Sequence, residues 1–231
     1  TNIIIIGGGI MGCSTAYHLM KNGCKDVILL ERAKLTSGTT WHSAAQVRQL
    51  RSSESLTRIV QNSVNLYSNL EEETGQATGW KETGSLSIAN NQDRLTHIRR
   101  QASLSKAFGI GAEEITVRKA SEKWPLMRID DLMGAVFSPT DGRVNPSDVC
   151  TALVKASKSR GLKVFEDTPV TGISTRNGRV SAIQTSKGLI SCDKIINCAG
   201  MWGRQIAGMA GVAAPLHACE HFYLLTEIIH S

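Results

Sequence analysis

A four-residue isoleucine run that leads directly into closely spaced glycines constrains this chain more than any other feature. Ile3–Ile6 is continuously β-branched, which predicts a strand buried on both faces. Gly7, Gly9 and Gly12 follow with the spacing G-x-G-x-x-G, and a helix is predicted to begin at Ile10. Glycines with this spacing allow a tight strand-to-helix turn whose backbone N–H groups approach a pyrophosphate closely. The segment therefore predicts a phosphate-binding turn of the dinucleotide type.

The next segment completes a β-α-β unit. Val27–Leu30 is a second apolar strand, and two parallel strands joined through a helix require a right-handed crossover. Glu31 follows this strand, 19 residues after Gly12. A carboxylate at this place accepts hydrogen bonds from a ribose 2′-hydroxyl and repels a 2′-phosphate. We therefore expect a dinucleotide without a 2′-phosphate, with Glu31 on its ribose.

Apolar periodicity and turn residues divide the rest of the chain into further elements. The predicted elements are a helix over 53–74, a strand at Ser85–Ala89, a helix over 93–108 capped by Asp93, a helix that follows Asn145 as N-cap and stops at Gly161, short strands from Val164 onward with turns at Asn177-Gly178 and Lys187-Gly188, a strand over 195–198, a helix from Trp202, and a strand in the tail 213–231. Segments 1–80 and 141–212 have nucleotide-fold character. We therefore predict an α/β fold whose parallel sheet is interrupted by a mixed α+β domain, made of 81–140 and 213–231, and we expect the chain to end within a domain.

Composition and charge argue against several other classes of protein. The net charge is +6, but the basic residues are scattered and aromatic residues make up only 5%, whereas a nucleic-acid interface combines a basic stripe with aromatic side chains. No apolar run approaches the ~20 residues that span a bilayer. The six cysteines form no C-x-x-C pair, so we expect free thiols and no metal site. We expect neither a nucleic-acid partner nor a membrane span.

The segment after Glu31 carries a more specific pattern. Residues 36–42 read Thr-Ser-Gly-Thr-Thr-Trp-His and lack the pattern of a further strand. This loop resembles the flavin-attachment loop of the sarcosine and dimethylglycine dehydrogenases, which belong to the D-amino-acid-oxidase-like superfamily of flavoproteins. In that family the histidine of the Trp-His pair is bonded covalently to the flavin 8α-methyl group, so the resemblance implies covalent attachment of FAD at His42. Ala45 departs from the family pattern, in which a glycine commonly stands at this position.

The resemblance extends over the whole chain, including 70–75, 78–80 and the segment 197–202 with its small-residue turn. It implies a Rossmann-like FAD-binding sheet of the glutathione-reductase type with an inserted substrate domain, truncated in this chain. In that family the second turn contacts the nucleotide, and the position of Val170 contacts the adenine by its main chain. The implied cofactor-binding residues are Gly7, Gly9, Gly12, Glu31, Arg32, Ser37, Thr39, Thr40, Trp41, His42, Val170, Ala199, Gly200 and Trp202.

The resemblance also implies a reaction, the oxidative demethylation of an N-methyl amino acid, sarcosine or dimethylglycine, by hydride transfer to flavin. In the relatives a strand with the pattern H-x-Y borders the substrate side of the flavin, which makes His221 and Tyr223 the candidate catalytic residues. Arg48 and Arg51 are candidate anchors for a substrate carboxylate, although solvent-exposed charge is the preferred interpretation. The implied electron acceptor is an electron-transfer flavoprotein. Tetrahydrofolate would bind only in a C-terminal region outside this chain, and the expected location is the mitochondrial matrix in a eukaryote or the cytoplasm in a bacterium.

Two alternatives remain open. The segment 215–223 resembles the regulatory subunit of pyruvate dehydrogenase phosphatase, a non-catalytic member of the same superfamily. That protein lacks the Trp-His pair in the attachment loop, so Trp41-His42 favours an enzyme. The other alternative is a binding module for NAD. Flavin absorbance that remains with the denatured protein would distinguish all three hypotheses.

Overall fold

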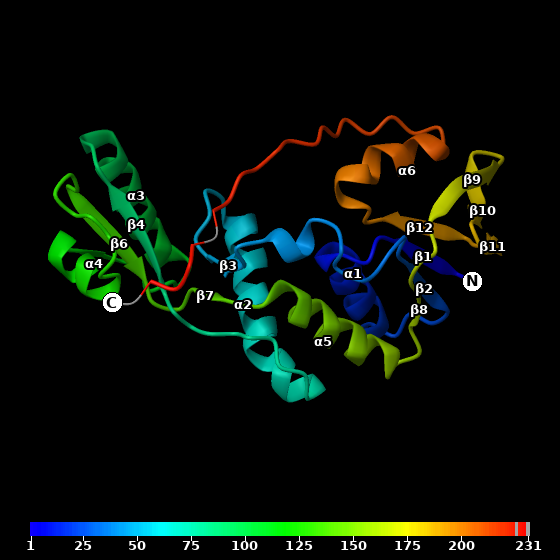
Figure 1. The fold of residues 1–231 in the computed structure, drawn as a ribbon, viewed down its shortest axis with the longest axis horizontal. Helices are drawn as coiled ribbons and strands as arrows, with labels where there is room; N and C mark the ends of the chain where they lie inside the picture. The colour runs from blue at the N-terminus through cyan, green and yellow to red at the C-terminus, as the bar shows by residue number, and fades with distance from the viewer. Residues whose placement is uncertain (225, 230–231) are drawn as a thin grey trace. The chain divides into compact units, whose positions relative to one another are not determined.

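The computed structural model describes residues 1–224 and 226–229, and Figure 1 shows the course of the chain. Two compact units are formed, the first by residues 1–44, 69–78 and 145–221, and the second by 45–68, 79–144 and the described residues after 221. In chain order the elements are β1 (Ile3–Ile6), α1 (Ile10–Lys21), β2 (Val27–Leu30), the 3-10 helix η1 (Thr40–His42), β3 (Gln46–Val47), α2 (Glu54–Thr74), β4 (Ser85–Ala89), α3 (Gln92–Ala107), β5 (Glu113–Ile115), α4 (Val117–Lys123), β6 (Gly134–Ser138), β7 (Gly142–Arg143), α5 (Pro146–Lys158), β8 (Lys163–Phe165), β9 (Val170–Arg176), β10 (Arg179–Thr185), β11 (Gly188–Ser191), β12 (Lys194–Asn197), the 3-10 helix η2 (Gly200–Trp202) and α6 (Gly203–Met209).

A four-stranded parallel sheet with the order β12-β1-β2-β8 forms the centre of the first unit. Successive side chains of β1 enter opposite layers, because side chains alternate along a strand. Ile5 packs with residues of α1, whereas Ile4 and Ile6 pack with residues of α6 and of the antiparallel sheet β11-β10-β9. The predicted α/β fold, with its buried parallel strands and helical crossover, is confirmed.

The helix ends follow local sequence. Asn145 caps α5, since its side-chain oxygen accepts hydrogen bonds from the backbone N–H groups of Ser147 at 3.0 Å and Asp148 at 3.3 Å, as predicted. The predicted cap of α3 was wrong by two positions. Asn91, in extended conformation, accepts from the N–H of Arg94 at 2.8 Å. Asp93 lies inside the first turn instead, where its charge complements the helix dipole.

The second unit is built on the antiparallel sheet β4-β6-β5. Leu95, Ile98 and Ala102 of α3 pack with Ala89 of β4 in one cluster of apolar side chains. Ala120 of α4 belongs to a separate cluster. A two-stranded ladder joins β3 to β7. The expected mixed strand and helix character of 81–140 is therefore present, and β3 adds residues from before this segment.

The boundaries of the two units differ from the predicted domains 1–80 plus 141–212 and 81–140 plus 213–231. Residues 45–68 belong to the second unit and 213–221 to the first. Long-range hydrogen bonds explain the first difference, because Gln49 bonds to Thr140 and Asp141. That the first unit binds FAD and the second holds the substrate stays a prediction.

The predicted strand in the tail was wrong for the residues that the structure describes. Residues 213–224 and 226–229 are irregular, and the side chain of Phe222 is 91% exposed. A strand requires a neighbour for its backbone N–H and C=O groups, and the tail pairs with none of the described strands. Leu225, His230 and Ser231 lie outside the described residues.

The described residues include neither a membrane-spanning helix nor a cluster of metal ligands. Within 1–224 and 226–229, each helix is too short or too polar to cross a bilayer. In that part of the chain the His, Cys, Asp and Glu side chains also form no group of three that could hold a metal ion.

Candidate functional site

The turn at residues 7–12, here called the first turn, leaves no room for side chains at Gly7, Gly9 and Gly12. Gly7 has a φ of 112°, and a Cβ atom there would collide with the carbonyl oxygen of Cys198. A Cβ atom at Gly12 would collide with the carbonyl oxygen of Gly7, and one at Gly9 would lie 2.8 Å from Thr40 Oγ1. Each glycine therefore permits a close approach between strand, helix and neighbouring loop.

The N-terminus of α1 is open to an anion. Gly9, the N-cap residue, offers no side-chain acceptor, and Thr40 Oγ1 accepts from the N–H of Ile10 at 3.0 Å. The other N–H groups of the first helical turn have no acceptor within the helix. They carry the positive end of the helix dipole, so a pyrophosphate would be stabilised here.

Glu31 lies against the first turn. Its carboxylate accepts from the N–H of Gly8 at 2.6 Å and from the N–H of Ala33 at 3.0 Å. An ionised carboxylate has about four acceptor positions, so these two bonds leave capacity for the hydroxyl groups of a ribose. The backbone N–H of Thr168 donates to the carbonyl of Glu31 at 2.9 Å, which places the segment leading to Val170 beside it.

The attachment loop, residues 36–42, is fastened to the first turn at both ends. The N–H of Thr36 donates to the carbonyl of Gly8 at 2.9 Å, and Thr40 binds Ile10 as described. Trp41 and His42 follow in η1, with ring centroids 3.8 Å apart and an angle of 37° between the rings. Both rings are exposed. The Trp-His pair thus directly follows Thr40, the residue through which the loop contacts α1.

A second turn, residues 198–202, follows β12 and adjoins both the first turn and the attachment loop. Asn197 shapes it, because its side chain accepts from the N–H of Ala199 at 3.2 Å and donates to the carbonyl of Gly203 at 2.8 Å. Gly200 has a φ of 54°, and a Cβ atom there would lie 3.8 Å from Thr39 Oγ1. The guanidinium carbon of Arg32 lies 3.7 Å from the centroid of the Trp202 ring.

These contacts bring most of the predicted cofactor residues of the first unit together. The connected set is Gly7, Gly9, Gly12, Glu31, Arg32, Thr39, Thr40, Ala199, Gly200 and Trp202. Val170 packs with Ala199 against the core of this unit, and Ser37 is exposed on the attachment loop.

Apolar side chains on three segments of the same region remain exposed. Met11 of the first turn is 67% exposed, Trp41 54% and Met201 of the second turn 51%. Exposed apolar side chains that gather around a polar turn are typical of a ligand site. An anion-binding helix end, a ribose-type carboxylate and exposed apolar side chains are together the chemistry that FAD requires, so these residues fit the cofactor.

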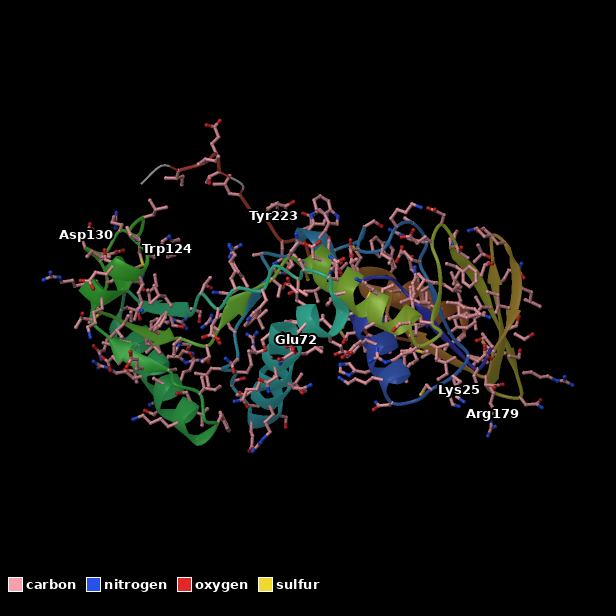
Figure 2. All side chains as sticks on the ribbon, turned by 90° about the horizontal axis from the view of Figure 1, so that it is seen from below. Lys25, Glu72, Trp124, Asp130, Arg179 and Tyr223 are labelled. Carbon is pink, nitrogen blue, oxygen red and sulfur yellow. The ribbon has the colours of Figure 1, made fainter. Side chains whose placement is uncertain are left out.

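The two predicted catalytic residues are not held in a strand. His221 and Tyr223 lie on the irregular tail, where both side chains are exposed, and Figure 2 labels Tyr223. Their catalytic role stays a prediction.

Arg48 and Arg51 lie in the segment between β3 and α2, in the second unit. A terminal nitrogen of Arg48 donates to Ser87 Oγ at 2.7 Å, while Arg48 Nε is buried without a hydrogen-bond partner. Arg51 is exposed. The burial of Nε departs from the preferred interpretation of Arg48 as a fully solvated charge, because a buried guanidinium donor without an acceptor is costly.

Sequence reasoning missed two polar clusters. In the second unit, Asp141 is 1% exposed and accepts from the N–H of Gln49 at 2.9 Å and from Ser85 Oγ at 2.6 Å. Apolar periodicity carries no signal for a contact among Gln49, Ser85 and Asp141. These residues come from three separate segments, so only the folded chain shows that they belong together.

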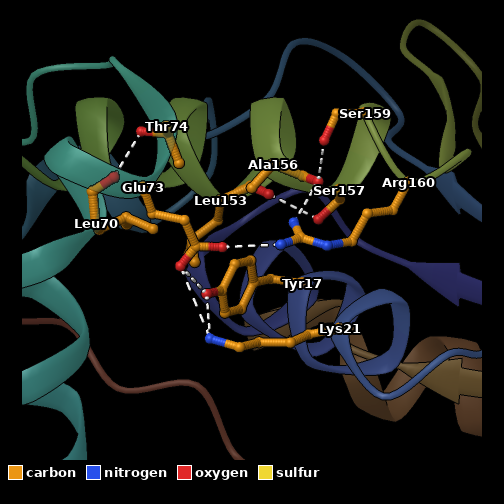
Figure 3. Close-up of polar contacts among 10 residues, drawn as sticks. All are labelled: Tyr17, Lys21, Leu70, Glu73, Thr74, Leu153, Ala156, Ser157, Ser159 and Arg160. Atoms are coloured by element: carbon orange, nitrogen blue, oxygen red, sulfur yellow. Dashed lines mark hydrogen bonds and ion pairs between the residues drawn. The ribbon is translucent and has the colours of Figure 1, made fainter.

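The second cluster joins α1, α2 and the segment that follows α5 within the first unit (Figure 3). Tyr17 donates its hydroxyl to Glu73 at 2.6 Å, Lys21 donates to the Tyr17 oxygen at 2.9 Å, and Arg160 donates to Glu73 at 3.0 Å. The hydrogen bond from Tyr17, together with the two cations, lowers the pKa of Glu73. Burial and the Glu73 carboxylate raise the pKa of Tyr17.

The thiol of Cys13 lies beneath the first turn and donates to the carbonyl of Gly8 at 3.5 Å. A hydrogen bond with Cys150 and complete burial raise its pKa, so the thiol stays protonated at neutral pH. Cys13 therefore acts as a small packing residue in this place rather than as a nucleophile.

Comparison with known proteins agrees with this geometry. The family model described as "DAO: FAD dependent oxidoreductase" matches residues 2–231. The chain is 44% identical over 234 residues to the mitochondrial sarcosine dehydrogenase of Mus musculus, and 41% identical over 228 residues to the mitochondrial pyruvate dehydrogenase phosphatase regulatory subunit of the same species. These matches cover 99% and 97% of this chain.

The chain spans 26% of the length of each of these relatives. Among solved structures, L-proline dehydrogenase from P. horikoshii superposes with a TM-score of 0.86 and 31% identity, over 92% of this chain and 56% of that one. The family model covers almost every residue, and the fold agrees with it. The chain belongs to the DAO family of FAD-dependent oxidoreductases.

Proposed function

We propose that the intact protein that carries this chain oxidises an N-methyl amino acid, sarcosine first and dimethylglycine second. The observation that carries the proposal is the Trp41-His42 pair at the end of a loop that Thr36 and Thr40 fasten to the phosphate-binding turn. The similarity to sarcosine dehydrogenase over 99% of the chain supports the substrate class.

We further propose that FAD is held covalently through His42. A neutral imidazole nitrogen is a nucleophile, and the 8α-methyl carbon of an oxidised flavin becomes electrophilic when it loses a proton. The new N–C bond would leave the flavin reduced by two electrons, and dioxygen would re-oxidise it. The exposed ring of His42, whose centroid lies 3.8 Å from that of the tilted Trp41 ring, offers such a nitrogen to a flavin lying over the exposed apolar side chains. The first and second turns, with Glu31, would bind the ADP half.

The bound flavin would supply the hydride acceptor for the carbon next to the substrate amine. The chain must then provide a proton acceptor, because only a neutral amine releases hydride readily. His221 is the proposed base and Tyr223 its proposed neighbour at the substrate. Arg48, with its unpaired Nε, is a proposed anchor for the carboxylate, together with Arg51.

The imine formed by oxidation of the amine would hydrolyse to the demethylated amine and formaldehyde. The electrons would pass from the reduced flavin to an electron-transfer flavoprotein. Similarity to a mitochondrial enzyme supports a location in the mitochondrial matrix if the source is eukaryotic; a bacterial source would place the protein in the cytoplasm. Tetrahydrofolate would bind outside this chain.

The attachment is tested by acid precipitation of the intact protein. Yellow colour should remain in the pellet of the wild type and be released in His42→Ala, while His18→Ala, a change of an exposed helical histidine, should retain it. Complete release of flavin from the wild type would refute covalent attachment and leave the family assignment intact.

The reaction is tested by anaerobic mixing of the intact protein with sarcosine, dimethylglycine or a D-amino acid, while flavin absorbance is followed. Bleaching by an N-methyl amino acid is expected, and bleaching by the D-amino acid alone would refute the substrate class. If His221 is the base, His221→Ala should slow bleaching by about 10²-fold or more. An unchanged rate would remove His221 from the mechanism.

The 41% identity to the phosphatase regulatory subunit favours a second candidate function, a flavin-fold regulatory protein without turnover. The same mixing experiment separates the two. A protein that holds FAD but is bleached by none of the amines would support the regulatory function.

A further inference from the structure

We propose that Arg32 and Trp202 form a clasp over the cofactor crevice and that opening of this clasp limits the rate at which FAD enters. The inference rests on FAD as the cofactor of the family and goes beyond the proposed reaction. It assigns to both residues a gating role that differs from simple contact with the cofactor.

The strand order places the two residues of the clasp on opposite sides of the first turn. β1 lies between β12 and β2 in the parallel sheet, and the first turn begins where β1 ends. Arg32 follows β2 and Trp202 follows β12, so the two residues originate on opposite sides of the first turn, about 10 Å apart at the usual strand spacing. Their side chains nevertheless meet, with the guanidinium carbon 3.7 Å from the ring centroid. Dinucleotides bind at this carboxyl edge of a parallel sheet.

The Trp202 side of the clasp is firmly held. Asn197 bonds to the backbone on both sides of the second turn, and Trp202 is the last residue of η2, immediately before α6. The ring also covers the attachment loop, since a Cβ atom at Gly38 would lie 3.4 Å from Trp202 Cζ3. A larger side chain at position 38 would push against the ring, so the loop and the clasp are packed together.

The Arg32 side is held more weakly. Its side chain is exposed, and among the described residues it has no carboxylate within ion-pair distance. Stacking on Trp202 is therefore the contact that orients the guanidinium. A cation–π contact at an exposed site is weak enough to open repeatedly, and its loss corresponds to a change of about 2- to 5-fold in an opening equilibrium.

Lys34 offers a matched control. It is a cation two residues further along the chain, but its ammonium is paired with Asp167 at 2.6 Å and with Glu166 at 3.5 Å. Replacing it with alanine removes a positive charge from the same loop and leaves the clasp intact.

The experiment measures the association rate of FAD with the intact apoprotein by stopped-flow quenching of flavin fluorescence, in a His42→Ala background so that binding is reversible. The variants are Arg32→Ala, Trp202→Leu, Trp202→Phe, Lys34→Ala and the double variant Arg32→Ala with Trp202→Leu. Arg32→Ala and Trp202→Leu should each raise the association rate about 2- to 5-fold, and the double variant should exceed neither single variant by much, because both changes open the same contact.

The alternative explanations predict different changes in the association rate of FAD. If Arg32 acts only through its charge, its removal slows the association of anionic FAD and Trp202→Leu has no effect, since charge is unchanged. Trp202→Phe keeps an aromatic face and, like Lys34→Ala, should remain near the wild-type rate. Association rates that are unchanged or slower in both Arg32→Ala and Trp202→Leu, or that add in the double variant, would overturn the clasp.

A second measurement needs no cofactor. Acrylamide quenching of the apoprotein, with Trp202→Phe subtracted to isolate Trp202, should show a more accessible ring in Arg32→Ala than in Lys34→Ala. Equal quenching in the two variants would contradict the clasp. Neither measurement contains an amine substrate, so failure of the clasp and failure of the proposed reaction are separate results.

Discussion

Glu31 in the first unit and Asp141 in the second are both carboxylates that accept backbone N–H groups, but their surroundings differ. Glu31 is half-buried and binds the N–H groups of Gly8 and Ala33. Asp141 is 1% exposed, and both of its oxygens are occupied, one by the N–H of Gln49 and the other by the hydroxyl of Ser85.

This difference in burial indicates that Glu31 serves ligand binding and that Asp141 serves the stability of the fold. A partly exposed carboxylate with acceptor positions to spare can exchange water for a ligand at little cost to the fold. A buried carboxylate is tolerated only when its acceptors are satisfied, and its donors in turn depend on it. Substitution of Glu31 should therefore change cofactor affinity, and substitution of Asp141 should change the free energy of unfolding.

The largest effect is expected from Asp141→Ala. It would leave the N–H of Gln49 and the hydroxyl of Ser85 buried without acceptors, and each such group costs ~1–3 kcal/mol. The free energy of unfolding of the intact protein should fall by about 3 kcal/mol in urea denaturation. Asp130→Ala, at an exposed position of the same unit (Figure 2), is the control and should change it by less than about 0.5 kcal/mol. Equal losses in the two variants would break the comparison.

Glu31→Gln should give the next largest effect. Hydrogen bonds to a charged group contribute ~1.5–3 kcal/mol, so FAD affinity should fall by about 10- to 100-fold in an equilibrium titration of the apoprotein. The melting temperature of the apoprotein should change little, because the amide oxygen still accepts one of the two N–H groups. A variant that melts early but binds FAD normally would reverse the roles assigned to Glu31 and Asp141.

Glu73 represents a third situation, a carboxylate paired with cations, and it adds a pH dependence. Its pKa is lowered in the folded state by Tyr17, Arg160 and Lys21. The stability that it contributes is therefore present above its ordinary pKa of about 4.3 and is lost as the pH falls through the folded-state pKa.

Melting temperatures of the intact protein between pH 7 and pH 3 should show this loss. Glu73→Gln should reduce the fall in melting temperature at acid pH. The corresponding change in the free energy of unfolding should be less than about 1 kcal/mol, because solvent screens a partly exposed ion pair. Glu72→Gln, at the exposed neighbouring position, is the control. An identical acid profile for Glu73→Gln and the wild type would contradict the prediction.

The smallest effect concerns Ala45, where the chain passes from the first unit into the second. Its φ of 60° lies in the left-handed region, which costs alanine roughly 1 kcal/mol. Ala45→Gly removes this strain but increases the entropy of the unfolded chain by ~0.4–1 kcal/mol, so a gain of at most about 0.5 kcal/mol is expected. Ala44→Gly is the control, because it increases the entropy of the unfolded chain without relieving strain, and it should lower the melting temperature of the protein. If both variants lower the melting temperature equally, the strain at Ala45 is absent.

Local sequence is sufficient to predict the first turn and the cap at Asn145, because neighbours in the chain determine these features. It was insufficient for the Asp141 cluster and for the stack of Arg32 on Trp202, whose members are 56 or more positions apart. The tail strand failed for a related reason. An alternating apolar pattern predicts a strand, but a strand forms only where another backbone is available to pair with it.

The position of β12 in the sheet has a consequence for how the protein is made. β1 is translated before β12, its partner on one side, and Ile3 lies opposite Lys194, 191 positions later. At about 5–20 residues per second, translation covers that distance in about 10–40 s. During this interval the isoleucine edge of β1 is unpaired on that side, which makes the nascent chain prone to aggregation. The second turn is synthesised after β12, so it too is absent throughout this interval.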